Sequence, residues 1–379
     1  MRKILSILTL TLVVATISQI SAFAADSISD GKKVLYMSAE LGLPIDAASG
    51  QMSPRGLIYY SDDNFLDTKT KFEAAFMGIY LSLASSHWGG YEDVNYGGRL
   101  FSTIHYNADY VKYNNGDFIK AETFNGSSNA GELFVVKDFD KNTNGKLSYS
   151  LSQNHYYANQ DTATTFILPV DNTIQAIVAR VETKSLVTTP WGEAQEGYRL
   201  WADAGLYFAD QYRAWGMPAT LSAGKKDYQK YQLSAAYYAQ PFGSGNGTVS
   251  LSANGRYGTG LDRLSMFALG GVSTIIPDSI KLHGYFGNEF FSDNLSLLNL
   301  EYAIPVWKHE SGKFNILTAY VSYDQAMMPV GSVRGIGLGA RMLLSPTSMI
   351  YLDYGYGIDA VRGTKTGGSD ITVKYDQAF

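Results

Sequence analysis

The sequence predicts an all-β protein, a transmembrane antiparallel β-barrel of about sixteen strands, and three observations support this fold class. Apolar and polar residues alternate with a period of two through many short segments, as strands with a lipid-facing and a lumen-facing side require. The 28 Tyr, 18 Phe and 5 Trp can supply aromatic girdles at two membrane interfaces. The 38 Gly against 10 Pro suit many turns and closely approaching strands. The mean hydropathy resembles that of a soluble protein, because polar lumen-facing residues offset apolar lipid-facing ones in any average.

The C-terminal segment illustrates the alternation. Its apolar face carries Ile371, Val373, Tyr375 and Phe379, and its polar face carries Asp370, Thr372, Lys374 and Asp376. A strand that ends on an aromatic C-terminal residue resembles those of bacterial outer-membrane proteins, whose assembly machinery recognises this signal. Tyr375 and Phe379 are therefore candidates for the assembly signal. The resemblance implies the outer membrane of a diderm bacterium, with outer-membrane lipid and the barrel assembly machinery as partners.

The N-terminus has the pattern of a secretory signal peptide. Arg2 and Lys3 precede a largely apolar stretch over residues 4–17, and Ala22-Phe23-Ala24 fits a cleavage site, so we expect residues 1–24 to be removed. A retained membrane anchor is the alternative, although the apolar stretch is short for a spanning helix. The chain has no Cys, which excludes lipid attachment at a Cys, disulfides and thiol chemistry.

Counted back from the C-terminus, the alternating segments predict sixteen strands. They span residues 370–379, 348–357, 333–344, 314–323, 295–305, 262–270, 247–258, 229–240, 216–223, 194–209, 173–184, 146–158, 131–139, 96–111, 71–84 and 54–62. Residues 25–53 would be a short periplasmic segment before a barrel of residues 54–379. Segments 173–184 and 216–223 alternate poorly, so a fourteen-strand barrel is one alternative and a large soluble β-sandwich is another.

The connections between these strands differ in length according to the side of the membrane. An even strand number places both ends of the barrel on the periplasmic side, with short turns there and long loops outside. The long connections, all external in this count, are residues 112–130, 159–172, 271–294 and 358–369. The short connections, all periplasmic, are residues 140–145, 224–228, 259–261 and 345–347.

The C-terminal third also carries motifs in a recognisable order. They are Phe267-Ala268-Leu269-Gly270-Gly271, Lys281-Leu282-His283-Gly284-Tyr285, Leu300-Glu301-Tyr302-Ala303-Ile304-Pro305, Gly335-Ile336-Gly337-Leu338-Gly339-Ala340-Arg341, Ser345-Pro346 and Tyr351-Leu352-Asp353-Tyr354. This order resembles the BamA/TamA superfamily, also called the bacterial surface antigen family. The resemblance covers roughly residues 262–379, and upstream only the strand pattern matches.

The resemblance implies a long external loop that folds back into the barrel lumen. In the family, an Arg in the Arg-Gly-Phe/Tyr tip of this loop pairs with inward carboxylates on two neighbouring strands. The tip here is His283-Gly284-Tyr285, so His stands where the family has Arg. Glu301 matches the first carboxylate. Ser322 stands at the second position, and Asp324 follows two residues on, facing the same way.

The exchange of Arg for His predicts a weaker attachment of this loop. Arg carries a permanent charge and a bidentate fork, whereas His is smaller and mostly neutral near pH 7. We therefore expect one hydrogen bond, charged or neutral, between His283 and Glu301 rather than a two-carboxylate clamp. The alternative is that His283 simply lies at the tip of an exposed loop.

Other motifs are better explained by structure than by chemistry. Gly335-x-Gly337-x-x-Ala340 formally fits a dinucleotide fingerprint, but these glycines lie in an alternating strand with Arg341 on its polar face. They instead leave room for the inward loop, and Arg341 is a further candidate for holding it. Asp140-x-Asn142-x-Asn144-Gly145 begins like a calcium loop but fits a hairpin turn better. The five His residues show no metal-ligand or catalytic spacing, so we expect no metal, cofactor or enzymatic activity.

These observations predict an outer-membrane barrel that moves or inserts protein, or lipid, through a lumen gated by the inward loop. Residues 25–53 are too few for a POTRA domain, so we expect a short form whose delivery partner, if any, is a separate periplasmic protein. The barrels of the family open between first and last strands, here 54–62 and 370–379. A passive pore for small solutes and a purely structural surface barrel are the alternatives. The net charge of −5 provides no polybasic surface, so nucleic acid is not an expected partner.

Overall fold

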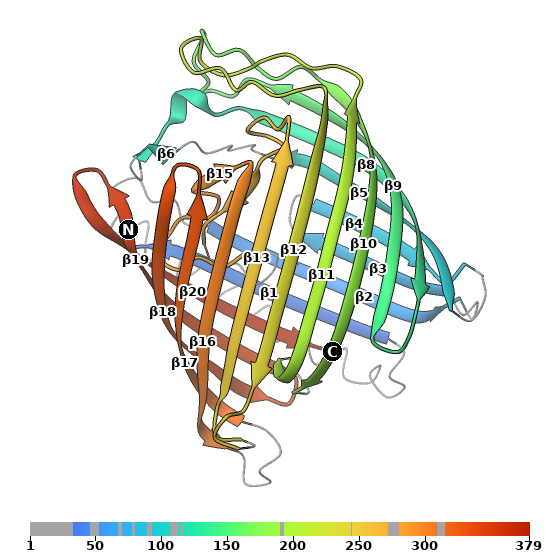
Figure 1. Ribbon diagram of the computed structural model, residues 1–379, viewed down its shortest axis with the longest axis vertical. Helices are drawn as coiled ribbons and strands as arrows, with labels where there is room; N and C mark the ends of the chain where they lie inside the picture. Colours follow the sequence, from blue (N-terminus) through green and yellow to red (C-terminus); the bar gives the residue numbers. More distant parts are fainter. Residues whose placement is uncertain are drawn as a thin grey trace.

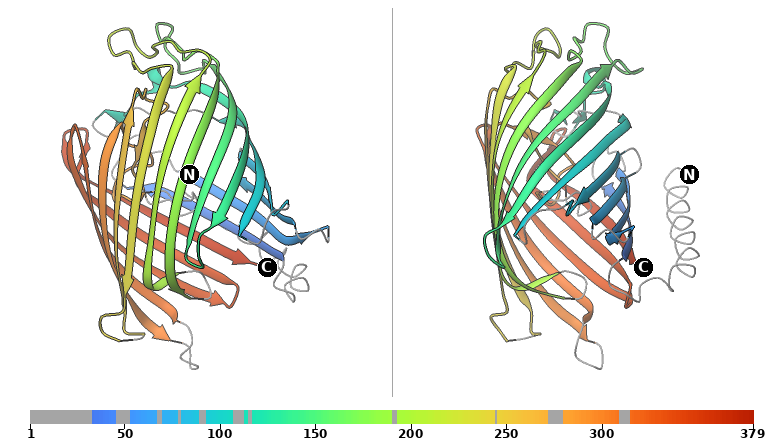
Figure 2. Two further views of the ribbon diagram at one scale, coloured as in Figure 1. Left: turned by 45° about the vertical axis from the view of Figure 1, so that its right-hand side comes forward. Right: turned by 90° about the vertical axis from the view of Figure 1, so that its right-hand side faces the viewer.

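The computed structural model shows a closed antiparallel β-barrel of sixteen strands (Figures 1 and 2). It describes residues 33–45, 53–66, 70–77, 80–88, 93–106, 113–114, 117–189, 193–243, 245–271, 280–308 and 315–379. The predicted signal peptide, residues 1–24, lies outside them. In the described part of the chain, no helix is long and apolar enough to cross a membrane.

Each barrel strand pairs with its neighbours in chain order, and the last strand pairs with the first. The strands are β1 (Lys33–Pro44), β2 (Ser53–Phe65), β3 (Thr70–Met77), β4 (Tyr80–Ser86), β5 (Val94–Tyr106), β8 (Asn125–Asp138), β9 (Thr143–Tyr157), β10 (Asn172–Thr188), β11 (Ala194–Ala209), β12 (Asp227–Ala239), β13 (Thr248–Thr259), β16 (Asn294–Lys308), β17 (Asn315–Met328), β18 (Gly331–Ser345), β19 (Ser348–Arg362) and β20 (Lys365–Ala378). Outside the wall, the chain forms β6 (Tyr113–Asn114) with β7 (Asp117–Phe118), and the 3₁₀-helix η1 (Lys120–Glu122).

Alternation along each strand separates the two faces of the wall. In β10, Ile177 and Val181 are 43% and 53% exposed on the outside, whereas the intervening Arg180 reaches Asp203 of β11 at 3.5 Å on the inside. The wall is thus apolar outside and polar inside, which is the pattern of a barrel that spans a membrane.

The predicted strand number is confirmed, but within it two missed strands offset two predicted strands that are absent. The first strand is β1, which lies in the segment 25–53 that was predicted to be periplasmic, so the barrel begins at Lys33. Pro44 and Pro54 disfavour a strand from sequence, but they lie at the end of β1 and the start of β2, where a strand tolerates Pro. The predicted strand 71–84 is two strands, β3 and β4.

Two predicted strands are absent from the wall. Residues 216–223 lie in the β11–β12 connection and make only isolated bridges, and residues 262–270 lie in the β13–β16 connection. Segment 262–270 alternates because Phe267 and Leu269 are buried in an apolar cluster, and alternation alone does not distinguish such a segment from a wall strand. Segment 216–223 alternates poorly and is mostly exposed.

These errors reversed the predicted direction of β2, β12 and β13. We call the end of the barrel where β1 begins and β20 ends the terminal end, and the opposite end the loop end. Residues 224–228 and 259–261 lie at the loop end and not at the terminal end, as was predicted. The connection predicted at 358–369 is only a two-residue turn between β19 and β20. The remaining long connections follow β5, β9, β11 and β13, and all four lie at the loop end.

Candidate functional site

The β13–β16 connection folds into the barrel lumen, as the resemblance implied (Figure 1). Its stem is a small two-stranded sheet, β14 (Phe267–Leu269) with β15 (Phe290–Ser292). Beyond the stem, Leu282 donates a backbone hydrogen bond to Gly271 at 3.0 Å, and His283-Gly284-Tyr285 form the tip. We call the described residues of this connection, 260–271 and 280–293, the inward loop.

Apolar side chains attach the inward loop to the wall. The loop members of this buried cluster are Leu261, Phe267, Leu269, Ile280, Leu282 and Tyr285, and the wall members are Leu295, Leu297, Ala326 and Ala360. Leu282 is 0% exposed and Tyr285 is 1% exposed. The inward loop therefore covers an apolar part of the inner face of the wall.

Glycines in β18 and β19 allow the tip to lie directly on the wall. A Cβ at Gly335 would come within 2.3 Å of the His283 carbonyl oxygen, and one at Gly337 within 2.4 Å of the His283 ring. A Cβ at Gly355 would lie 2.4 Å from the Gly284 nitrogen. Gly284 has φ +78°, and its own Cβ would overlap the backbone of β19. The small inward residues thus make room for the loop, as the strand pattern suggested.

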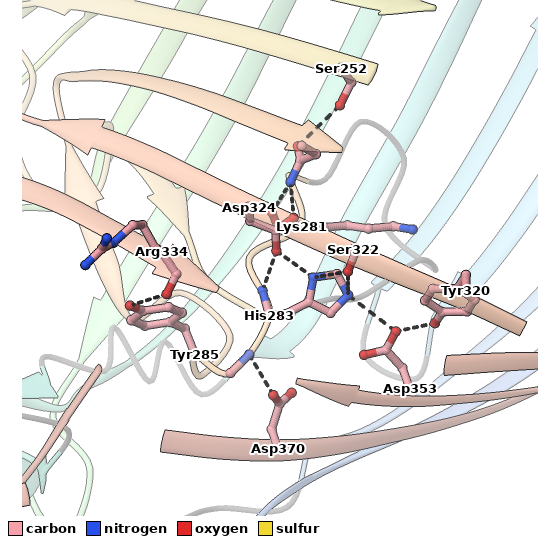
Figure 3. A network of polar contacts seen from close by, with 12 residues as sticks. Ser252, Lys281, His283, Tyr285, Tyr320, Ser322, Asp324, Arg334, Asp353 and Asp370 are labelled. Atoms are coloured by element: carbon pink, nitrogen blue, oxygen red, sulfur yellow. Dashed lines mark hydrogen bonds and ion pairs between the residues drawn. The ribbon is translucent and has the colours of Figure 1, made fainter. Parts of the chain in front are cut away.

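His283 lies between two carboxylates, each on a different strand (Figure 3). Its Nδ1 is 2.5 Å from Oδ2 of Asp324 on β17, and its Nε2 is 3.4 Å from Oδ2 of Asp353 on β19. The Ser322 hydroxyl contacts the same ring at 3.2 and 3.3 Å. A ring with a carboxylate at each nitrogen can donate to both only as the imidazolium, so the geometry favours a charged His283.

The pKa of His283 reflects this environment. Burial by itself lowers the pKa, but hydrogen bonds to Asp324 and Asp353, together with their negative charges, outweigh burial and raise it to about 10. At neutral pH, His283 therefore carries a positive charge, as an Arg at this position would.

Asp324 is the centre of the polar network. It is 1% exposed, and it accepts hydrogen bonds from the backbone N–H of His283 at 2.8 Å and from the Asn299 side chain at 2.7 Å, besides the imidazole. Asn299 also donates to the carbonyl of Lys281 at 2.9 Å. Tyr320 donates to Asp353, which fixes the second carboxylate. Residues on β16, β17 and β19 therefore act together to hold the loop tip, through hydrogen bonds and opposite charge.

The predicted partner of His283 was wrong, and so was the single hydrogen bond. Glu301 instead accepts from Arg341 at 2.8 Å, and Arg341 also approaches Glu193 at 3.4 Å. His283 has a two-carboxylate clamp made of other residues, and at 2% exposed it does not tip an exposed loop. Asp353 was not predicted to contact His283, although it lies in the motif Tyr351-Leu352-Asp353-Tyr354.

A second group of contacts on the loop was not predicted at all. Arg362, at the end of β19, forms a bidentate ion pair with Glu289 of the loop at 2.7 and 3.0 Å, and the two side chains are 5% and 6% exposed. Arg362 also donates to the Gly284 carbonyl at 3.2 Å. Asp370 of β20 accepts from the Gly284 N–H at 2.8 Å (Figure 3). In the sequence, the only feature that distinguishes Arg362 is its position beside a hairpin turn.

Below the inward loop, towards the terminal end, the lumen holds a cavity of about 650 Å³ with a mixed polar and apolar lining. Loop residues Ile280, Lys281 and His283 border it on one side, and wall residues such as Ser234 and Asn254 border it on others. The cavity therefore ends at the loop that carries the clamp. Among the described residues, no group of His, Cys, Asp or Glu is arranged to hold a metal ion.

Solved structures share this fold. BamA from Haemophilus ducreyi, in a structure lacking POTRA domains 1–3, matches with a TM-score of 0.63 and 11% identity over 90% of this chain and 70% of that chain. CdiB from Acinetobacter baumannii matches with a TM-score of 0.59 and 12% identity over 92% of this chain and 60% of that one. CdiB from Escherichia coli matches with a TM-score of 0.56 and 12% identity over 90% of this chain and 63% of that one.

These similarities concern the fold of the barrel. This chain spans less than two thirds of either CdiB chain. No family model matches the sequence, and no curated protein matches it.

Proposed function

We propose that this chain is an outer-membrane barrel of the BamA and CdiB kind, which moves or inserts protein, or lipid, at the outer membrane of a diderm bacterium. The observation that carries the proposal is the inward loop, clamped at its tip by two carboxylates inside a barrel of this fold. The terminal end would face the periplasm and the loop end the outside. Outer-membrane lipid would surround the apolar outer wall, and the barrel assembly machinery would insert the chain.

The packing of the loop supports a gated barrel over an open pore. Six large apolar loop side chains are almost fully buried: Leu261, Phe267, Leu269, Ile280, Leu282 and Tyr285. Burying each contributes about 1.5–3 kcal/mol, so withdrawing the whole loop would cost roughly 9–18 kcal/mol before the ion pairs are counted. Thermal motion alone would rarely withdraw it. The barrel at rest would therefore be shut at its outer end, and cargo or a periplasmic delivery partner would drive its opening.

Site-specific photocrosslinking in cells tests whether polypeptide enters the barrel. A photoreactive amino acid replaces Ser234, which borders the cavity, and the matched control replaces its neighbour Leu233, which is 60% exposed on the outer wall. We expect polypeptide adducts of reproducible mass from Ser234 and lipid adducts from Leu233. Polypeptide adducts from neither position, together with a large steady conductance of the intact barrel, would contradict the proposal and favour the passive pore.

A further inference from the structure

The barrel closes at one seam, where β1 pairs with β20. The two strands share nine Cα pairs in register, from Tyr36 opposite Ala378 to Pro44 opposite Asp370. Near the terminal end, Phe379 donates a backbone hydrogen bond to Leu35 at 2.7 Å. The seam is thus a continuous antiparallel ladder over these nine pairs.

On the β20 side of the seam, the inward loop has three attachments. Gly284 donates to the Asp370 carboxylate, Arg362 donates back to the Gly284 carbonyl, and Arg362 forms the bidentate ion pair with Glu289. The Arg362 guanidinium also lies 4.0 Å from the centroid of the Phe286 ring. Because this ion pair is almost fully buried, loss of either partner would leave an uncompensated charge.

On the β1 side, the same stretch of loop lies against Arg55 of β2. A Cβ on Gly287 would come within 2.9 Å of Nη2 of Arg55. Nη1 of Arg55 is 3.2 Å from Oε1 of Glu40, a β1 residue that is paired in register with Lys374 of β20. Loop residues 284–289 therefore reach from the hairpin that contains β20 to the ion pair that joins β1 and β2.

We propose that residues 284–289 of the inward loop brace the seam from inside, so that release of the loop tip and separation of β1 from β20 are coupled. Arg362 is the positioning residue of this brace, because it binds the loop at two points from the β19–β20 hairpin. The inference rests on the proposed role of the loop as a gate, but its test measures the seam and does not depend on any cargo.

Hydrogen–deuterium exchange of the purified barrel in nanodiscs tests the coupling. The variant is Arg362→Gln, and the matched control is Arg334→Gln, which removes a more exposed ion pair with Asp359 on the same part of the wall. We expect Arg362→Gln to speed exchange of the β1 peptide, residues 35–44, about tenfold, within the usual range of coupling between sites. The reference peptide from β11 should not change, and Arg334→Gln should leave both peptides unchanged.

The β1 peptide separates a brace from a local structural role, because Arg362 lies on the other side of the seam. Faster exchange confined to the hairpin around Arg362, with β1 unchanged, would overturn the inference. Glu289→Gln should reproduce the effect of Arg362→Gln, and the double variant should add little to either. Equal and additive effects on all strands would mean general destabilisation and would also overturn it. A barrel that passes this test yet yields no polypeptide adducts would retain the brace and lose only the proposed cargo.

Discussion

Replacing Asp324 by Asn should release the tip of the inward loop. Asn keeps the size of the side chain but removes the charge that faces the His283 imidazolium, and its amide places N–H donors where three N–H donors now point. Removing one partner of a buried ion pair typically costs about 3–5 kcal/mol. Because Asp353 remains as the second carboxylate, we take the lower end, about 3 kcal/mol. At about 1.4 kcal/mol for each factor of ten, the population with a free tip should rise about a hundredfold.

Thiol labelling measures this population, because the chain has no Cys of its own. Ala326→Cys places one thiol on β17 beneath the loop, at a position that is 0% exposed. When the loop closes faster than the reagent reacts, the labelling rate is proportional to the open fraction. Asp359→Asn is the matched control, since it removes a more exposed ion pair with Arg334 and should change the rate less than about threefold. If Asp324→Asn labels no faster than this control, Asp324 does not hold the loop.

The same thiol tests three further expectations. Gly284→Ala should raise the labelling rate at least as much as Asp324→Asn, because its Cβ would overlap the β19 backbone at a positive φ; an unchanged rate would contradict this packing. The pKa of His283 is about 10 when folded against about 6.5 unfolded, so its stabilisation is complete below pH 6.5 and is lost as pH rises through 10. Labelling, normalised to a freely accessible thiol, should therefore rise from pH 7 to pH 10, and a flat profile would contradict a charged His283. Glu301→Gln should leave the labelling rate within about threefold of that of the unsubstituted protein, because Glu301 binds Arg341. A hundredfold rise in the rate would show instead that Glu301 helps to hold the loop tip.

The sequence predicts the local structure of the wall well and its closure poorly. Alternation is a property of a few neighbouring residues, so long strands such as β11 and β13 are found where expected. Which strand closes the barrel depends on pairing between the two ends of the chain. β1 was missed because its pairing with β20, more than 320 residues away, leaves no local signal that outweighs Pro44 and Pro54.

The candidate site was likewise predicted only in part from the sequence. The tip at His283 and the room made by Gly335 and Gly337 follow from the motif order, and the structure places them together. The carboxylate that closes the clamp from β19, Asp353, could not be chosen from sequence, because several inward carboxylates alternate on these strands. Arg362 and its partner Glu289 are 73 residues apart and belong to no motif, so only the folded chain reveals their ion pair.

Single-channel conductance of the refolded barrel in a planar bilayer, beside a variant lacking residues 267–292, tests most directly whether the inward loop shuts the lumen. The variant loses β14, β15 and the tip but keeps all sixteen wall strands. We predict small, flickering currents from the intact barrel and large, steady currents from the variant. Large steady currents from the intact barrel would contradict a lumen closed by the loop.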